Sequence, residues 1–138
     1  MAFLKTPLTL RAVLIGNAVF SCITGLGMAI WSTEIAAVMG LLLHVVLLIV
    51  GPALVFYGLF LAWLSIQPLK DRRSIVLACT IADVLWVLGT LGLAVLHPSF
   101  LTSTGWIIAI ATATVVGVFA LFQAFGVLDQ RETRHVNR

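Results

Sequence analysis

The sequence predicts an all-α integral membrane protein, a four-helix bundle that spans the bilayer. Of its 138 residues, 62% are hydrophobic and only 9% are charged, and the mean hydropathy is +1.18. Soluble domains carry about 25% charged residues, and a soluble fold of this length has too few charges here to cover so much apolar surface. Four apolar stretches are long enough to cross the hydrocarbon, which takes about 20 residues. Lipid is therefore the solvent for most of the chain.

The four predicted spans cover residues 11–31, 44–66, 74–96 and 106–127. Lipid cannot hydrogen-bond backbone amides, so each spanning segment must be a helix or a strand of a closed barrel. These apolar runs are continuous rather than alternating, and they are too long for barrel strands, which favours helices. Short loops then make successive helices antiparallel neighbours within a single membrane domain over residues 1–138.

Between the first two spans, residues 33–40 form either a short helix in the membrane interface or a plain connector. Ser32 or Thr33 can cap the start of a helix, and Glu34 suits the positive N-terminal end of a helix dipole. Apolar residues then recur at helical spacing through the segment, as in helices that lie at an interface. The sequence leaves both interpretations open.

All eight Lys and Arg residues lie in three short segments. These are Lys5 with Arg11, then Lys70 with Arg72 and Arg73, and finally a basic tail over 129–138 that holds Arg131, Arg134 and Arg138. Four spans place these segments on one side, and positively charged loops stay in the cytoplasm, so both termini are predicted to be cytoplasmic. No nucleic-acid partner is expected, because no folded basic module surrounds the tail. We expect a multi-pass protein of the bacterial cytoplasmic (inner) membrane.

A shift of 66 residues, without gaps, aligns unusual positions of the first two spans with those of the last two. Asn17 falls on Asp83, Phe20 on Trp86, Thr24 on Thr90, Gly51 on Gly117 and Tyr57 on Gln123. The first and third spans run in the same direction, so the pattern is that of a tandem, parallel repeat of one helical hairpin. Two apolar hairpins of similar length also align by chance, so repeat ancestry and coincidence both stay open.

Asp83 lies inside the third span, ten residues after Arg73 and therefore about 15 Å into the membrane. Asn17 of the first span and Tyr57 of the second lie at a similar depth. Burial disfavours an ionised carboxylate, and no Lys or Arg lies deep inside a span to offset that cost. We therefore predict that Asp83 faces the bundle interior, contacts Asn17 or Tyr57, and is neutral for much of the time, so that it donates a hydrogen bond.

Two interpretations of this polar group stay open. It is either a packing clasp, since polar contacts between membrane helices contribute about 0.6–2 kcal/mol, or a binding site for a proton or ligand, the default hypothesis for an ionisable residue in a membrane. The candidate site residues share the depth of Asp83 or its helix face: Asp83, Asn17, Tyr57, Ser21, Thr80 and Trp86.

Sequence motifs give no indication of catalysis. The chain contains no Walker loop, GxSxG, HExxH, paired catalytic carboxylates or Cys/His metal cluster. Cys22 and Cys79 lie in apolar segments without ligand-type spacing. We therefore expect no enzyme activity, no cofactor and no metal. Gln123, Thr112 and Thr114 are weaker candidates for lining the bundle.

The stretches "GNAVFSCITGLG" and "ADVLWVLGTLGLAV", separated by a basic turn, resemble small uncharacterised four-helix integral membrane proteins of bacteria. The resemblance covers nearly the whole chain, rests on degenerate motifs and implies no activity. The chain differs from small multidrug transporters, which have a glutamate in the first span where this chain has Asn17. It also lacks the glycine-rich stretch ending in Arg-Tyr that is typical of fluoride channels.

Three functions are compatible with these features. The first is a transporter or channel for protons or small solutes, built around Asp83 and acting as a homo-oligomer. The second is a non-catalytic accessory subunit that packs into a larger membrane complex through its glycine faces. The third is a bundle that binds lipid or another hydrophobic ligand between its helices. All three have the lipid bilayer as a partner.

Overall fold

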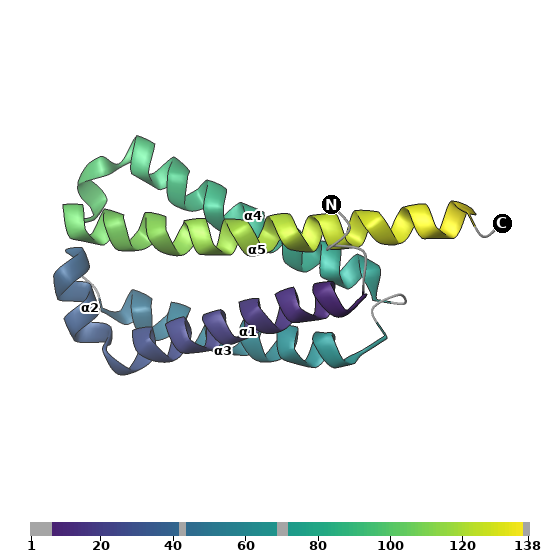
Figure 1. The fold of residues 1–138 in the computed structure, drawn as a ribbon. Helices are drawn as coiled ribbons and strands as arrows, with labels where there is room; N and C mark the ends of the chain where they lie inside the picture. The colour runs from purple at the N-terminus through teal and green to yellow at the C-terminus, as the bar shows by residue number, and fades with distance from the viewer. Residues whose placement is uncertain (1–6, 42–43, 69–71, 137–138) are drawn as a thin grey trace.

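The structure is a computed structural model that describes residues 7–41, 44–68 and 72–136. Its elements, in chain order, are α1 (Pro7–Ile30), α2 (Ser32–Met39), α3 (Val45–Ile66), α4 (Arg73–Leu96), the 3-10 turn η2 (Pro98–Phe100) and α5 (Ser103–Val136) (Figure 1). The helices α1, α3, α4 and α5 are long and apolar enough to cross a membrane. The predicted all-helical fold with four membrane-spanning helices is therefore confirmed.

The segment between the first two spans is a helix, α2, rather than a plain connector. It ends at Gly40, whose left-handed backbone (φ 75°) terminates the helix. The predicted cap is wrong: Trp31 occupies the N-cap position, and no side chain caps the helix. Only Trp31 separates α2 from α1, and its backbone carries the hydrogen bonds of both helices, accepting from Ile35 N and donating to Gly27 O, each at 2.9 Å.

Helix α5 extends beyond the predicted span at both ends. It begins at Ser103, where the Thr102 hydroxyl oxygen accepts a hydrogen bond from Gly105 N at 3.0 Å, as an N-cap residue does. It continues to Val136, well into the predicted basic tail, and projects past the other helices (Figure 1). The tail is rich in Gln, Arg and Glu, which are good helix formers, and contains no Gly or Pro to end the helix.

The bundle consists of two helix pairs. Helix α1 packs along α3, which we call the first hairpin, and α4 packs along α5, which we call the second hairpin (Figure 1). Contacts between α1 and α5 join the hairpins, whereas α3 and α4 make little close backbone contact. Both hairpins start at one end of the bundle, called here the terminus end; α2 lies at the opposite end, called the α2 end.

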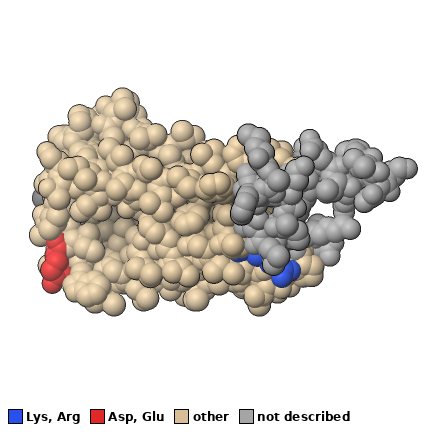
Figure 2. All heavy atoms as spheres, in the orientation of Figure 1, with Lys and Arg blue, Asp and Glu red and all other residues tan. Residues whose placement is uncertain are grey.

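Charged side chains mark the two ends of the bundle. Figure 2 shows arginine side chains at the terminus end, an acidic side chain at the α2 end and an uncharged surface between them. Arg11 donates to Gln67 O at 3.4 Å, and the Arg72 guanidinium lies 5.8 Å from the centre of the Trp63 ring. Large apolar side chains are exposed between the ends, for example Phe56 at 73%. An uncharged apolar belt of this kind suits lipid contact.

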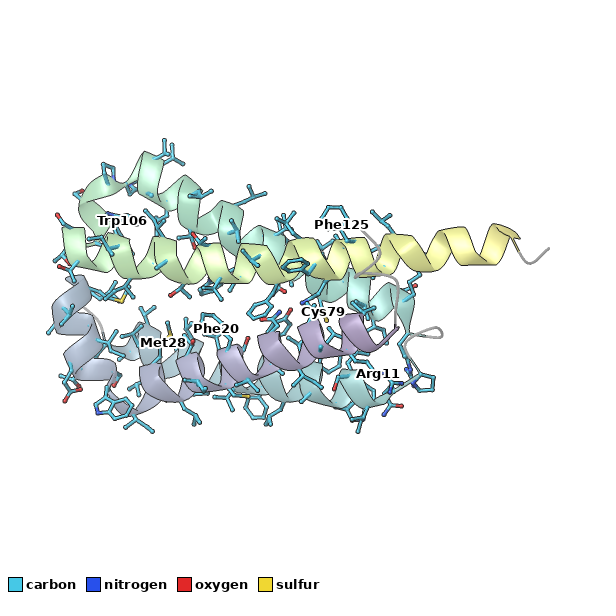
Figure 3. All side chains as sticks on the ribbon, in the orientation of Figure 1. Arg11, Phe20, Met28, Cys79, Trp106 and Phe125 are labelled. Atoms are coloured by element: carbon cyan, nitrogen blue, oxygen red, sulfur yellow. The ribbon has the colours of Figure 1, made fainter. Side chains whose placement is uncertain are left out.

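An apolar cluster fills the space between the hairpins in the half of the bundle nearer the terminus end. We call it the apolar plug, and it consists of Leu10, Leu14, Ala18, Leu61, Leu64, Val76, Cys79 and Val127. In Figure 3 Cys79 and Phe20 lie between the hairpins, whereas Phe125 points outward. These side chains are at most 5% exposed, so the plug is closely packed in this half of the bundle.

Candidate functional site

All four long helices meet at the Asp83 carboxyl group. Asp83 is 4% exposed. Its Oδ2 accepts a hydrogen bond from Asn17 Nδ2 of α1 at 2.7 Å and a longer one from Gln123 Nε2 of α5 at 3.4 Å. Its Oδ1 lies 2.8 Å from the Tyr57 hydroxyl of α3. Each of the three other long helices therefore contributes one polar side chain to this carboxyl.

A second layer of hydroxyl groups orients the two amides. The Ser21 hydroxyl donates to Asn17 Oδ1 at 3.4 Å, and the Thr80 hydroxyl lies 3.2 Å from Gln123 Oε1 and 3.0 Å from Val76 O. With their carbonyl oxygens facing these hydroxyls, both amides turn their nitrogens to Asp83. Every buried side-chain polar atom of the described residues has a hydrogen-bond partner. A fully satisfied buried network of this kind holds its members in one arrangement.

The Tyr57 hydroxyl has two acceptors within reach but only one proton to donate. It lies 2.8 Å from Asp83 Oδ1 and 3.2 Å from the Cys79 carbonyl oxygen. When Asp83 is ionised, Tyr57 donates to the carboxylate. When Asp83 is protonated, the acid donates to the Tyr57 oxygen and Tyr57 donates to Cys79. The same heavy-atom positions therefore suit both protonation states of Asp83. In the protonated state, Asp83 can donate a hydrogen bond to Tyr57, as the sequence predicted.

The network solvates the carboxyl group without neutralising its charge. Asn17, Tyr57 and Gln123 are neutral donors. Among the described residues, the basic side chains Arg11, Arg72 and Arg73 belong to the terminus end. Arg73, on the same helix as Asp83, precedes it by ten residues. An ionised carboxylate at this buried position thus has no counter-charge among the hydrogen-bond partners that the structure describes. A proton or a bound cation would have to supply it.

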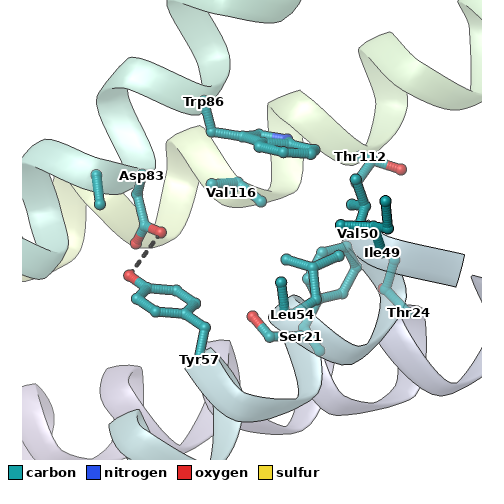
Figure 4. A pocket seen from close by; sticks show the side chains of 13 residues that line it. Ser21, Thr24, Ile49, Val50, Leu54, Tyr57, Asp83, Trp86, Thr112 and Val116 are labelled. Atoms are coloured by element: carbon teal, nitrogen blue, oxygen red, sulfur yellow. Dashed lines mark hydrogen bonds between the residues drawn. The ribbon is translucent and has the colours of Figure 1, made fainter. Parts of the chain in front are cut away.

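A cavity of about 290 Å³ adjoins Asp83 on the side nearer the α2 end. The Tyr57–Asp83 contact forms one end of it, and Trp86 and Thr112 lie along its walls (Figure 4). Apart from these polar groups and two hydroxyls of α1, the lining is apolar. This volume is near the lower end of ordinary ligand pockets, which run from about 300 Å³. Asp83 is the only carboxyl group in its described lining.

The mouth of this pocket lies between α3 and α4. The exposed residues of its lining all belong to these two helices, with Ile49 at 67% and Trp86 at 40%, whereas the lining residues of α1 and α5 are buried or half-buried, with Ser21 at 4% and Val116 at 8%. The pocket therefore has its floor on α1 and α5 and opens sideways, where the helix surface would meet lipid.

The structure brings all six sequence-predicted site residues together. Asn17, Tyr57 and Asp83 bond directly, Ser21 and Thr80 bond the amides, and Trp86 lines the pocket. Gln123, which the sequence indicated only as a weaker candidate for lining the bundle, also belongs to the site; its alignment with Tyr57 under the 66-residue shift was a usable signal. Thr112 lines the pocket, whereas the exposed Thr114 bonds its own helix through Ile110 O at 2.8 Å.

No group of three or more His, Cys, Asp or Glu residues within the described ranges is arranged to hold a metal ion. Cys22 and Cys79 are both free thiols. Comparison of the chain with known protein families, with curated proteins and with solved structures finds no match. The function is therefore inferred from the geometry of the site.

Proposed function

We propose that the protein is a small membrane transporter in which a proton and a small solute occupy Asp83 in turn. The observation that carries this proposal is the position of Asp83: an ionisable side chain without a counter-charge forms the inner end of a pocket at mid-membrane depth. A packing clasp needs neither a pocket nor an ionisable group, since asparagine would make the same contacts. Intramembrane ionisable residues commonly mark proton or substrate pathways.

The two protonation states of Asp83 support the proton part of the proposal. The Tyr57 hydroxyl lies within hydrogen-bond distance of both Asp83 Oδ1 and Cys79 O, so rotation of one hydroxyl accommodates a proton on the acid. No heavy atom has to move. A group that gains and loses a proton at little structural cost is suited to repeated exchange with a solute.

The apolar plug favours a transporter over an open channel. Leu14, Leu61, Leu64 and Val76 are each 0% exposed and fill the bundle on the terminus side of Asp83. A solute bound at Asp83 therefore has a path on one side only. Release to the opposite side requires the two hairpins to move relative to each other, as in alternating access.

The test is the reaction of Asp83 with a carbodiimide. Dicyclohexylcarbodiimide is lipophilic, reaches membrane-facing pockets and adds to a protonated carboxyl group. Wild-type protein in lipid nanodiscs would be treated across a pH series, and the site of addition mapped by mass spectrometry of peptides. We expect labelling at Asp83 that increases as the pH falls, and little labelling by a water-soluble carbodiimide.

The matched control is Asp83→Asn, which keeps the size and hydrogen bonding of the side chain but has no acid to react. The residual labelling of this variant reports the other carboxyl groups. A wild-type Asp83 that stays unmodified at every pH, in protein that remains folded, would contradict the proposal and favour the packing clasp.

We also propose that the active form is a homo-oligomer. Three glycines that the fold leaves open support this: a Cβ atom added at Gly27, Gly89 or Gly92 would meet no atom within 4 Å. Small residues on outer faces allow helices of neighbouring chains to approach closely. Native mass spectrometry from nanodiscs checks the stoichiometry, and a single chain per disc at all protein-to-lipid ratios would refute this part.

A further inference from the structure

We infer that the solute is a lipophilic amine with one positive charge in its bound form, and that it enters sideways from the lipid between α3 and α4. This inference rests on the proposed function and specifies its substrate class. It depends on three observations: the charge balance at Asp83, the composition of the pocket wall and the location of the pocket mouth.

The charge balance requires a single positive charge on the bound solute. Asp83 is the one acidic residue in the described lining of the pocket, and its three hydrogen-bond donors are neutral. Oδ2 already accepts two hydrogen bonds, whereas Oδ1 accepts one, from Tyr57, and a carboxylate oxygen has room for a second. An ammonium N–H fits that remaining position, and charge-assisted hydrogen bonds of this kind are the strong ones.

The pocket wall favours an organic cation over a metal ion. Divalent metal ions such as Ca²⁺ and Mg²⁺ need several oxygen ligands, and here Asp83 supplies the only carboxyl group of the described lining. The remaining wall is mostly apolar and includes the rings of Phe20, Tyr57 and Trp86. Aromatic rings attract organic cations through their faces, and the apolar wall accommodates a hydrocarbon body.

The location of the mouth indicates entry from the lipid. The exposed lining residues Ile49 and Ala53 of α3 face the exposed Ala82 and Trp86 of α4 across the seam where the two helices make little contact. Ile49 and Tyr57 are eight residues apart on α3, or about 12 Å. A solute lying along this slot would have its nitrogen near mid-membrane and its hydrocarbon body toward the α2 end.

Entry from the lipid means that the amine arrives in its neutral, unprotonated state. A neutral amine dissolves in lipid far more readily than an ammonium ion. Inside the pocket, the proton moves from the Asp83 carboxyl oxygen to the lone pair of the amine nitrogen, forming an N–H bond and leaving a carboxylate beside an ammonium. The total charge stays zero throughout. Tyr57 then turns its hydroxyl from Cys79 O to Asp83 Oδ1.

The test compares two molecules of the same shape, N,N-dimethylphenethylamine and its carbon isostere isopentylbenzene. Binding to wild-type protein in zwitterionic nanodiscs is measured by equilibrium dialysis, with empty nanodiscs correcting for partition into lipid. We expect saturable binding of the amine, and about tenfold weaker binding of the isostere, the loss expected for one charge-assisted contact. Asp83→Asn should bind both molecules equally weakly.

The entrance is tested with two phenylalanine substitutions one turn apart on α4. Ala82 and Ala78 are both exposed on the same helix face, but only Ala82 lines the pocket. Ala82→Phe should slow association of the amine and weaken its binding, whereas Ala78→Phe should leave both unchanged. Equal behaviour of the two variants would overturn entry between α3 and α4.

Other outcomes separate this inference from the proposed function. Isopentylbenzene binding as tightly as the amine would overturn the cationic class. Saturable binding of neither molecule, in protein whose Asp83 reacts with dicyclohexylcarbodiimide, would refute the amine while leaving the proposed function intact. An unreactive Asp83 would remove the proposed function itself. If Asp83→Asn fails to fold, the wild-type comparison of amine and isostere still decides the question.

Discussion

The two hairpins carry similar polar positions but differ in how closely their helices approach. In the first hairpin, α1 and α3 meet at glycines. A Cβ atom at Gly25 would lie 2.5 Å from Gly51 O, one at Gly51 would lie 2.7 Å from Gly25 O, and one at Gly58 would lie 2.6 Å from Cys22 Sγ. These contacts leave no room for a methyl group. The helices therefore pack backbone to backbone, as small residues permit in membranes.

The second hairpin is more open at the corresponding positions. A shift of 66 residues places Leu91, Gly117 and Ala124 where the first hairpin has its three glycines. A Cβ atom at Gly117 would meet only a Val87 methyl group at 3.6 Å, and a cavity of about 470 Å³ lies between α4 and α5, lined in part by these three residues. Three glycines at the crossing thus accompany the close pair, whereas one glycine with Leu91 and Ala124 accompanies the open pair, although both hairpins carry polar residues at aligned positions.

The same shift relates the residues that meet at the site. Asn17 bonds to Asp83, 66 residues later, and the aligned pair Tyr57 and Gln123 both reach the Asp83 carboxyl. The two donors from the close-packed first hairpin lie at 2.7 and 2.8 Å, whereas Gln123 of the open second hairpin lies at 3.4 Å. A contact between aligned residues, such as that of Asn17 with Asp83, is what a tandem repeat about an axis along the membrane normal would produce, and repeat ancestry stays a hypothesis.

The comparison of two membrane hairpins requires that α5 crosses the membrane, so that its two ends lie on opposite sides. Cysteines placed at Ser99, between α4 and α5, and at Asn137, in the basic tail, should react with a membrane-impermeant thiol reagent from opposite sides. The native Cys22 and Cys79 are inside spans and serve as the background control. Labelling of both new cysteines from one side would break the topology and the comparison with it.

The next largest effect is expected on stability, when leucine replaces a glycine that contacts the neighbouring helix and, for comparison, a glycine that does not. Gly25→Leu places its side chain against the backbone of α3 and should destabilise the fold toward the top of the range of about 1–3 kcal/mol seen for overpacking. Gly89→Leu is the matched control for packing within one chain, because no atom of the same chain lies within 4 Å of its Cβ position. Unfolding in mixed detergent micelles measures both. Equal stability of the two variants would contradict the close packing of α1 on α3.

Replacing Asp83 tests the junction between the hairpins. Asp83→Leu leaves the amide nitrogens of Asn17 and Gln123 without this acceptor, whereas Tyr57 can still donate to Cys79 O. We expect a cost of about 1–2 kcal/mol in unfolding free energy, given the modest strength of polar contacts in membranes. Asp83→Asn retains an acceptor oxygen and should cost less than half as much. The same micelle assay ranks them. A fully stable leucine variant would mean that the network adds nothing to the association of the hairpins.

The smallest effect separates the two aligned residues Tyr57 and Gln123. Tyr57→Phe removes a 2.8 Å hydrogen bond and should cost about 1 kcal/mol. Gln123→Leu removes a 3.4 Å contact and should cost about 0.5 kcal/mol, near the mean for polar contacts between membrane helices. A double-mutant cycle with Asp83→Leu, which removes both contacts, measures each coupling. A larger coupling for Gln123 than for Tyr57 would contradict the weaker contact that the second hairpin makes with Asp83.

The sequence by itself determined the helical class, the four spans and the depth of the polar residues. The physical reason is that lipid requires every backbone amide to be bonded within its own helix, so long apolar runs have one available structure. A helix rise of about 1.5 Å per residue then converts sequence position into depth. That conversion places Asn17, Tyr57 and Asp83 at a similar depth from sequence position alone.

Only the tertiary structure decided which glycines close a helix pair, that Gln123 joins the site and that the pocket opens between α3 and α4. In a soluble bundle, the apolar stripe of a helix shows which face is buried. Here lipid is as apolar as the core, so Leu14 in the plug and Ile15 beside it look alike in sequence, although one is 0% and the other 49% exposed. The rotation of each helix is set by packing against its neighbours, and only the folded bundle contains that information.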